Sequence, residues 1–379
     1  MKYFILFYLC AFLSCTFKAQ DRETLTVKPM LKSPYHNTIQ LALLLDVSSS
    51  MDGLIDQAKS ELWTIVNEVA KAKKNNVNAK LEIALYEYGR GTGDARNGYI
   101  SKLLNYTSNL DSISLVLFSL RTNGGDEYCG QVIHNAVNEL TWRDNDSIYK
   151  VIFIAGNEPF NQGRVDYKNS AELAKSRGIY INTIFCGQSA EGIGSYWLDG
   201  AKAGNGEYFF IDQNAVVRDI PTPFDMEIGL YNDSLNATYW SYGAAGKKAK
   251  DMQVEQDRNA ESMSASVKAK RAVSKANAVY NNSQWDAVDA VNSDSTWIEK
   301  TQDEALPVQL KNKTLVQKKA ILASNARMRS TYSMRINQLN IERELFLRTH
   351  SKDPQANTLS NALIMAIHKQ AASKGFVFQ

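Results

Sequence analysis

Residues 38–51, TIQLALLLDVSSSM, decide the fold of this chain. The first part, residues 38–45, is a nearly unbroken apolar run, which is typical of a strand buried on both faces of a parallel sheet. Polar residues 46–52 follow, and apolar residues then recur every three or four positions from Leu54 to Val69. This spacing predicts a helix with one buried face, so the chain enters its first domain as strand, polar loop and helix.

Strand and helix patterns continue to alternate after this helix. We predict strands at residues 81–88, 99–106, 149–154, 179–185 and 208–211, and helices at residues 110–120, 128–142 and 170–177. Strands that alternate with helices indicate a doubly wound α/β fold, in which helices cover both faces of a mostly parallel sheet. Beyond residue 223 the strand signal fades. Long helices are expected at residues 244–280, 314–348 and 357–374, with a short strand or a loop at residues 297–310.

These patterns divide the 379 residues into a signal peptide (1–19), a sheet domain (35–225) and a mainly α-helical C-terminal extension (226–379). The length allows two domains, because single cores rarely grow past ~250–300 residues. Charge is also divided: 22 Lys and Arg stand against 27 Asp and Glu before Asn236, and 21 against 13 from there on. Because acids are mixed into the basic part, we interpret it as a solvated helical surface and expect no nucleic acid as a partner.

The N-terminus has the layout of a secretory signal, with cleavage expected after Ala19. Its apolar run at residues 3–13 is too short to span a bilayer of ~30 Å. The alternative is lipid anchoring at Cys15, but Phe12 and Leu13 stand where a lipoprotein signal usually has Leu and a small residue. No later segment is apolar for ~18 residues. We therefore expect an exported protein, periplasmic, in the cell envelope or secreted, with no membrane span in the mature chain.

Removal of the signal would leave two cysteines, Cys129 and Cys186. Cys129 lies near the start of the helix predicted at residues 128–142, and Cys186 lies at the carboxyl end of a predicted strand. Both are therefore expected near the same edge of the sheet. An exported compartment permits a disulfide, which requires Cα atoms about 4.4–6.8 Å apart. Two buried apolar thiols are the alternative. The sequence leaves both open.

The loop after the first strand carries the most informative side chains. Asp46, Ser48 and Ser50 follow that strand at alternate positions, at the edge where parallel sheets place their binding sites. One carboxylate and two hydroxyls that converge are hard oxygen donors, which suit Mg²⁺ and also Mn²⁺ or Ca²⁺. The alternative is that Ser48 or Ser50 caps the following helix. Capping would account for one serine but not for the set of three.

Residues 43–51, LLLDVSSSM, resemble the first loop of the metal ion-dependent adhesion site of von Willebrand factor type A (VWA) domains, and the resemblance covers about residues 38–224. In that family the two serines bind the ion directly, and the Asp binds it directly or through water. A second loop supplies Thr and a third supplies Asp, which leaves one position for an acidic residue of a partner. The resemblance implies a non-enzymatic, metal-dependent binding or adhesion module for a protein or cell-surface partner.

The second loop departs from the family pattern. Residues 122–127, TNGGDE, place Asp126 directly after two glycines, where the family commonly has its Thr. The GGDE form, with Trp142 and Arg143 further on, resembles one branch of VWA proteins. The resemblance therefore implies a metal site formed by Asp46, Ser48, Ser50 and Asp126.

The third loop departs as well. Residues 154–159, IAGNEP, align Gly156 with the family's third-loop Asp. One carboxylate is thus lost from the third loop and one is gained in the second. Asn157 and Glu158 are candidates for a replacement oxygen, and a degenerate site without metal is the alternative.

Enzymatic patterns are incomplete in this chain. Residues 187–191, GQSAE, nearly form a G-x-S-x-G nucleophile elbow, but Glu191 replaces the last glycine. The glycine-rich residues 89–93 precede a predicted strand and not the helix that a phosphate-binding loop requires. Of the four histidines, His134 lies in a predicted helix and is expected to be packed there. The alternative function is an exported hydrolase with Ser189 as nucleophile.

Overall fold

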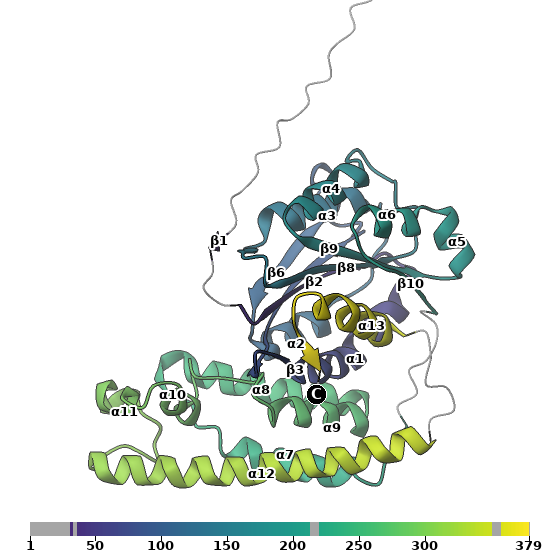
Figure 1. Ribbon diagram of the computed structural model, residues 1–379. Coiled ribbons are helices and arrows are strands. Elements are labelled where there is room, and N and C mark those ends of the chain that lie inside the picture. Colours follow the sequence, from purple (N-terminus) through teal and green to yellow (C-terminus); the bar gives the residue numbers. More distant parts are fainter. Residues whose placement is uncertain (1–30, 33–35, 213–219, 351–357, 379) are drawn as a thin grey trace, which may run out of the picture.

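The computed structural model describes residues 31–32, 36–212, 220–350 and 358–378 (Figure 1). A six-stranded sheet forms its centre, in the order β10-β9-β8-β2-β5-β6. The strands are β2 (Thr38–Asp46), β5 (Lys80–Tyr88), β6 (Ser101–Thr107), β8 (Tyr149–Gly156), β9 (Ile179–Cys186) and β10 (Tyr208–Ile211). The neighbours from β10 to β5 are parallel, and β6 alone in this sheet is antiparallel. The predicted mostly parallel α/β fold is confirmed.

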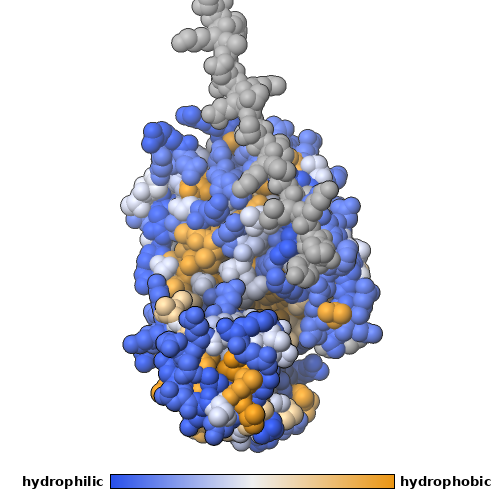
Figure 2. All heavy atoms as spheres, turned by 90° about the vertical axis from the view of Figure 1, so that its left-hand side faces the viewer, coloured by the Kyte–Doolittle hydropathy of each residue, from blue (hydrophilic) through white to orange (hydrophobic). Residues whose placement is uncertain are grey.

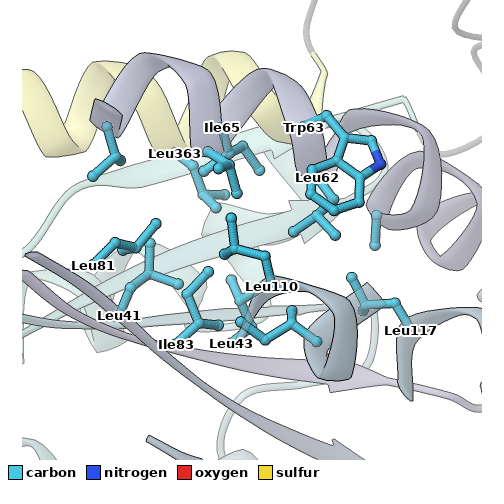
Figure 3. Close-up of a cluster of buried hydrophobic side chains, with 14 of the residues drawn as sticks. Leu41, Leu43, Leu62, Trp63, Ile65, Leu81, Ile83, Leu110, Leu117 and Leu363 are labelled. Atoms are coloured by element: carbon cyan, nitrogen blue, oxygen red, sulfur yellow. The ribbon is translucent and has the colours of Figure 1, made fainter. Parts of the chain in front are cut away.

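Strand β2 lies in the middle of the sheet, and its alternate residues divide the core into two clusters. Leu41 and Leu43 face one side, where they meet α1 (Asp52–Ala70), α2 (Leu110–Ser119) and α13 (Leu359–Ala372), as Figure 3 shows. Ala42 and Leu44 face the other side, which is covered by α3 (Cys129–Glu139), α4 (Tyr167–Ser176) and α6 (Trp197–Ala203) (Figure 1). Because both faces are covered, the strand needs apolar residues at nearly every position, which explains the unbroken run in the sequence.

The helices after the sheet domain form further layers beyond α1 and α2 (Figure 1). They are α7 (Asp225–Ala237), α8 (Gly243–Met263), α9 (Ala265–Lys275), α10 (Ala287–Ser293), α11 (Trp297–Lys300) and the long α12 (Leu315–His350). Among the helices of the described residues, none has the length and apolar character that crossing a membrane requires. Their outer surface is mainly hydrophilic, with a few apolar patches (Figure 2).

Two local predictions in this region were wrong. The single helix expected at residues 244–280 is two helices, because Ser264 has extended backbone (φ −169°, ψ 161°) and its side chain accepts a hydrogen bond from the Val267 amide as the N-cap of α9. Residues 297–310 form neither a strand nor a plain loop. They contain α11 and a 3₁₀ turn at Asp303–Ala305.

The C-terminus returns to the sheet domain. Helix α13 covers the sheet beside α1, and Gln370 on its inner face bonds to Tyr149 of β8 and Asn182 of β9, each at 2.7 Å. Strand β11 (Val377–Phe378) then pairs with β3 (Ala72–Lys74), which also pairs with β4 (Val77–Asn78). The last residues of the described chain are therefore part of the same layer as the first helix. The predicted signal peptide, with Cys15, lies outside the described residues.

A buried ion network joins the helical layers to the sheet domain. Arg271 of α9 donates to Asp111 of α2 at 2.8 Å and to Asp257 of α8 at 2.5 Å, and its guanidinium lies 4.8 Å from the ring centre of Trp63. Lys275 also donates to Asp257, at 2.8 Å. Burial alone would raise the pKa of Asp257, but the two cations hold it well below its usual range. Removing one partner would leave buried charges uncompensated.

We therefore predict that Arg271→Ala lowers the free energy of unfolding by about 3–5 kcal/mol. The matched control is Arg335→Ala, because Arg335 pairs with Glu227 at a similar distance (2.8 Å) while both side chains are about 40% exposed. Exposed pairs contribute at most about 1 kcal/mol. Urea unfolding of the two variants measures the difference. Equal losses would show that the buried network does not hold the layers together.

Candidate functional site

Asp46 stands at the carboxyl end of β2, where the ends of the neighbouring parallel strands meet. Its register partner is Tyr88, the last residue of β5, and Gly156 ends β8 on the other side. The Asp46 side chain is fully buried. Its Oδ1 accepts a hydrogen bond from the Ser48 amide at 2.7 Å, whereas its Oδ2 has no hydrogen-bond partner among the described residues. One carboxylate oxygen is thus left without the donor that a buried charge requires.

The two serines of the loop lie beside this carboxylate. Ser48 Oγ is 3.3 Å from Ser50 Oγ, and the Asn157 amide nitrogen donates to Ser50 Oγ at 3.2 Å. Helix α1 begins at Asp52 with Met51 as its N-cap residue and no capping hydrogen bond from a side chain. Neither serine caps the helix, so helix capping, the alternative role that the sequence left open for Ser48 or Ser50, is excluded.

The second loop brings Glu127 to the site. A Cβ atom at Gly89 would lie 2.9 Å from both Asp46 Oδ1 and Glu127 Cγ, so these two side chains pack against the same point of the backbone. Glu127 is buried, whereas Asp126 is exposed and accepts a hydrogen bond from the Tyr128 hydroxyl at 3.1 Å. The sequence singled out Asp126 and missed Glu127. The GGDE pattern does not distinguish them, because it does not show which of two neighbouring side chains of the loop points inward.

Packing around Gly156 explains why the third loop lacks the Asp of the family pattern. A Cβ atom at Gly156 would lie 2.4 Å from the Tyr88 hydroxyl and 3.0 Å from Asp46 Oδ2, so no side chain fits there. The Tyr88 hydroxyl donates to the Ala155 carbonyl at 2.9 Å and fills the space. Asn157 donates a hydrogen bond to Ser50, as described, and Glu158 lies close enough for its charge to raise the pKa of Asp46. Both replacements named from the sequence therefore border the site.

Glycines let residues 89–93, the loop after β5, approach the second loop closely. A Cβ atom at Gly91 would overlap the Gly124 carbonyl, at 1.4 Å, and one at Gly125 would lie 2.6 Å from the Gly91 nitrogen. The glycine-rich residues 89–93 thus pack backbone against backbone on the second loop. This contact accounts for their composition.

The site concentrates negative charge. Burial raises the pKa of Asp46 to about 6, and the charge of Glu158 adds to the rise, whereas hydrogen bonds from Ser48 and the nearby Asn157 backbone amide oppose it. Burial also raises the pKa of Glu127 to about 7, and the charges of Asp46 and Glu158 contribute. Asp46 and Glu127 are thus two carboxyl groups whose ionisation is costly, and a bound cation there would lower the free energy.

The other residues considered from the sequence lie apart from this site or are packed. Ser189 begins α5 (Ser189–Gly194), and its carbonyl accepts a hydrogen bond from the Tyr208 hydroxyl. The four histidines have other neighbours: His134 contacts Asn138, His368 contacts Glu68, His36 contacts Ser147, and His350 contacts Phe346. Cys129 and Cys186 are free, buried thiols, with the Cys129 sulfur 4.0 Å from the Tyr88 hydroxyl. The structure thus has the thiol alternative and no disulfide between them.

Comparison with known proteins gives structural matches only. No family model matches the sequence, and no curated protein matches it. Among solved structures, the conserved hypothetical protein BatB from Bacteroides thetaiotaomicron is 16% identical, with a TM-score of 0.36, over 46% of this chain and 90% of that chain. The VWA domain of SpRpn10 is 18% identical, with a TM-score of 0.35, over 47% and 90% of the two chains. Mussel proximal thread matrix protein 1 is 14% identical, with a TM-score of 0.33, over 46% and 41%. The fold class itself rests on the strand order and connections described above.

Asp46 and Glu127 should make the cation-free protein sensitive to pH. Both carboxyl groups hold a proton more firmly in the folded chain, with pKa values of about 6 and 7, than at their ordinary values of 3.8 and 4.5. Protonation therefore stabilises the fold, and this contribution is lost as the pH rises through the folded values. In EDTA, the double variant Asp46→Asn/Glu127→Gln should gain stability relative to the parent between pH 5 and pH 8. A difference in urea midpoint that stays constant over this range would contradict the assignment.

Proposed function

We propose that the carboxyl edge of the sheet is a divalent-cation-dependent binding site for a protein or cell-envelope partner, and that the chain is an exported binding module and not an enzyme. The observation that carries the proposal is the buried Oδ2 of Asp46, which accepts no hydrogen bond of normal geometry from the described residues, beside two serine hydroxyls that cap no helix. The resemblance of residues 43–51 to the adhesion site of VWA domains points the same way.

The oxygens present fit Mg²⁺, and Mn²⁺ or Ca²⁺ would take the same donors. Asp46, Ser48 and Ser50 would hold the ion, and the 3.3 Å between the two hydroxyl oxygens is close to the ~3 Å that separates neighbouring ligands in an octahedral shell. In the described residues no three acidic, thiol or imidazole side chains converge as a metal site by themselves. The hydroxyls are therefore essential to the proposal. The second loop would complete the site through Glu127, with Asp126 at its exposed rim.

The bound cation would attract a carboxylate of the partner, and the carboxylates of this chain would weaken that attraction. The charge of Glu158 raises the pKa of both Asp46 and Glu127, so the three carboxylates lie close together. They would neutralise much of the positive field of a bound ion before a partner arrives. We infer that the ion orders the first and second loops, and that the surface around them makes much of the contact with the partner.

Mg²⁺ should raise the melting temperature of the parent protein, and EDTA should reverse the rise, because a ligand of the folded state stabilises it by mass action. Asp46→Ala should abolish this shift while the fold persists. Asp94→Ala is the matched control, since Asp94 is exposed on a neighbouring loop and pairs with Arg96. Identical Mg²⁺ shifts in the parent and in Asp46→Ala would remove Asp46 from the site.

A second experiment distinguishes the two acids of the second loop. Glu127→Gln should weaken Mn²⁺ binding in calorimetric titrations by about tenfold or more, the equivalent of about 1.4 kcal/mol. Asp126→Asn should change it less, because the Asp126 side chain is exposed and directed to Tyr128. The reverse order would make Asp126 the ligand, as the resemblance alone implies.

The partner itself is sought by capture from cell-envelope extracts. The parent protein should retain a specific partner in Mg²⁺ and release it in EDTA, and Asp46→Ala should retain none. Capture that is equal for the parent and the variant, with or without EDTA, would contradict a metal-dependent partner.

A further inference from the structure

A second site lies at the opposite end of the strands. A cleft of about 640 Å³ opens between the start of β5, the end of β6 and the loop that follows α9. This volume is within the range of ligand sites, about 300–1,000 Å³. Asp46 ends β2, whereas the cleft is lined by Lys80 and Leu81, which begin the adjacent parallel strand β5. The cleft is therefore separate from the proposed metal site.

The cleft is lined mainly by neutral hydrogen-bonding groups. Amide and hydroxyl side chains come from both walls: Asn78, Thr107, Ser108, Asn281, Asn282 and Ser283. The two charged residues in the lining are Lys80 and Glu82, which pair with each other at 3.0 Å, and Glu82 also pairs with Arg143 at 2.5 Å. An ionic ligand would find this charge already compensated. A neutral ligand with many donors and acceptors matches the lining.

One buried group in the lining still lacks a partner. Asn282 is 7% exposed, and its Oδ1 accepts a hydrogen bond from Trp285 Nε1 at 3.1 Å, which fixes the orientation of its amide. Its Nδ2 has no partner among the described residues. Buried donors are normally satisfied by protein, water or ligand. A ligand in the cleft that supplied a hydrogen-bond acceptor would give this group a partner.

The wall of the cleft after α9 is firmly held in place. The Tyr280 hydroxyl donates to Asp111 at 2.6 Å, the Tyr242 hydroxyl donates to the Ser283 carbonyl at 2.6 Å, and the backbone N–H of Asn282 donates to Asp289 at 2.8 Å. These bonds tie the loop to α2 and α10. A cleft held in this way loses little conformational freedom when a ligand binds.

From these observations we propose that the cleft binds a neutral saccharide of one or two sugar rings. Sugar hydroxyls both donate and accept, as the amide and hydroxyl lining requires, and the C–H faces of a sugar suit the apolar part of the lining, which includes Leu81 and Val279. Tyr106 and Trp285 also contribute to the lining. This proposal is independent of the metal site.

The test uses the full chain with maltose, cellobiose and N,N′-diacetylchitobiose as probes, in saturation-transfer NMR and calorimetric titration. At least one disaccharide should bind the parent protein. Ala278→Trp, at an exposed position in the lining, should fill the cleft and weaken binding at least tenfold. Ala265→Trp is the matched control, because Ala265 is exposed at the other end of α9 and outside the lining, and it should bind as the parent does.

Asn282→Asp keeps the acceptor for Trp285 and removes the free donor, so it should also weaken binding, while the melting temperature reports that the fold is intact. Inorganic phosphate should not compete, and EDTA should have no effect. No binding by any of the three disaccharides, or equal binding by Ala278→Trp and Ala265→Trp, would overturn the proposal. Competition by phosphate would overturn the neutral class, and loss of binding in EDTA would place the ligand at the metal site.

Discussion

A carboxylate buried at the end of the central strand is the constraint around which the carboxyl edge of the sheet is organised. Asp46 is fully buried, and only one of its oxygens accepts a hydrogen bond from a described residue. A buried charge without compensation is costly, so the group must hold a proton or bind a cation. The neighbouring Glu127 increases this cost, because it places a second carboxyl group against the first.

Close backbone packing makes this arrangement possible and also restricts it. Gly89, Gly91 and Gly125 allow the loops to approach so closely that side chains at these positions would collide with their neighbours. Gly156 faces the hydroxyl of Tyr88, which takes the space that a third-loop carboxylate would need. The second buried carboxylate, Glu127, comes instead from the second loop, while Glu158 of the third loop acts from the border of the site. The site differs from the pattern that its first loop resembles, and packing around Tyr88 is the physical reason.

The sequence predicted those parts of the structure that depend on local patterns. The apolar run at residues 38–45 indicated β2, and the polar loop after it indicated where the candidate site would lie. Sequence patterns did not predict contacts between segments that are distant along the chain. Whether Asp126 or Glu127 enters the site depends on which side chain of the second loop points inward. The need for glycine at position 156 depends on Tyr88, which comes from another strand. The break at Ser264 was missed because a serine within a helical pattern does not reveal that it caps a new helix.

The most direct measurement of the central claim is an anomalous difference map from crystals of the full chain grown with Mn²⁺. The account predicts a peak beside the carboxylate of Asp46, within about 2.0–2.3 Å of the hydroxyl oxygens of Ser48 and Ser50. It also predicts that the Glu127 carboxylate lies in the first or second layer of oxygens around the ion. A well-ordered loop without a peak at saturating Mn²⁺, or a peak bound only by Asp126 and its exposed neighbours, would contradict it.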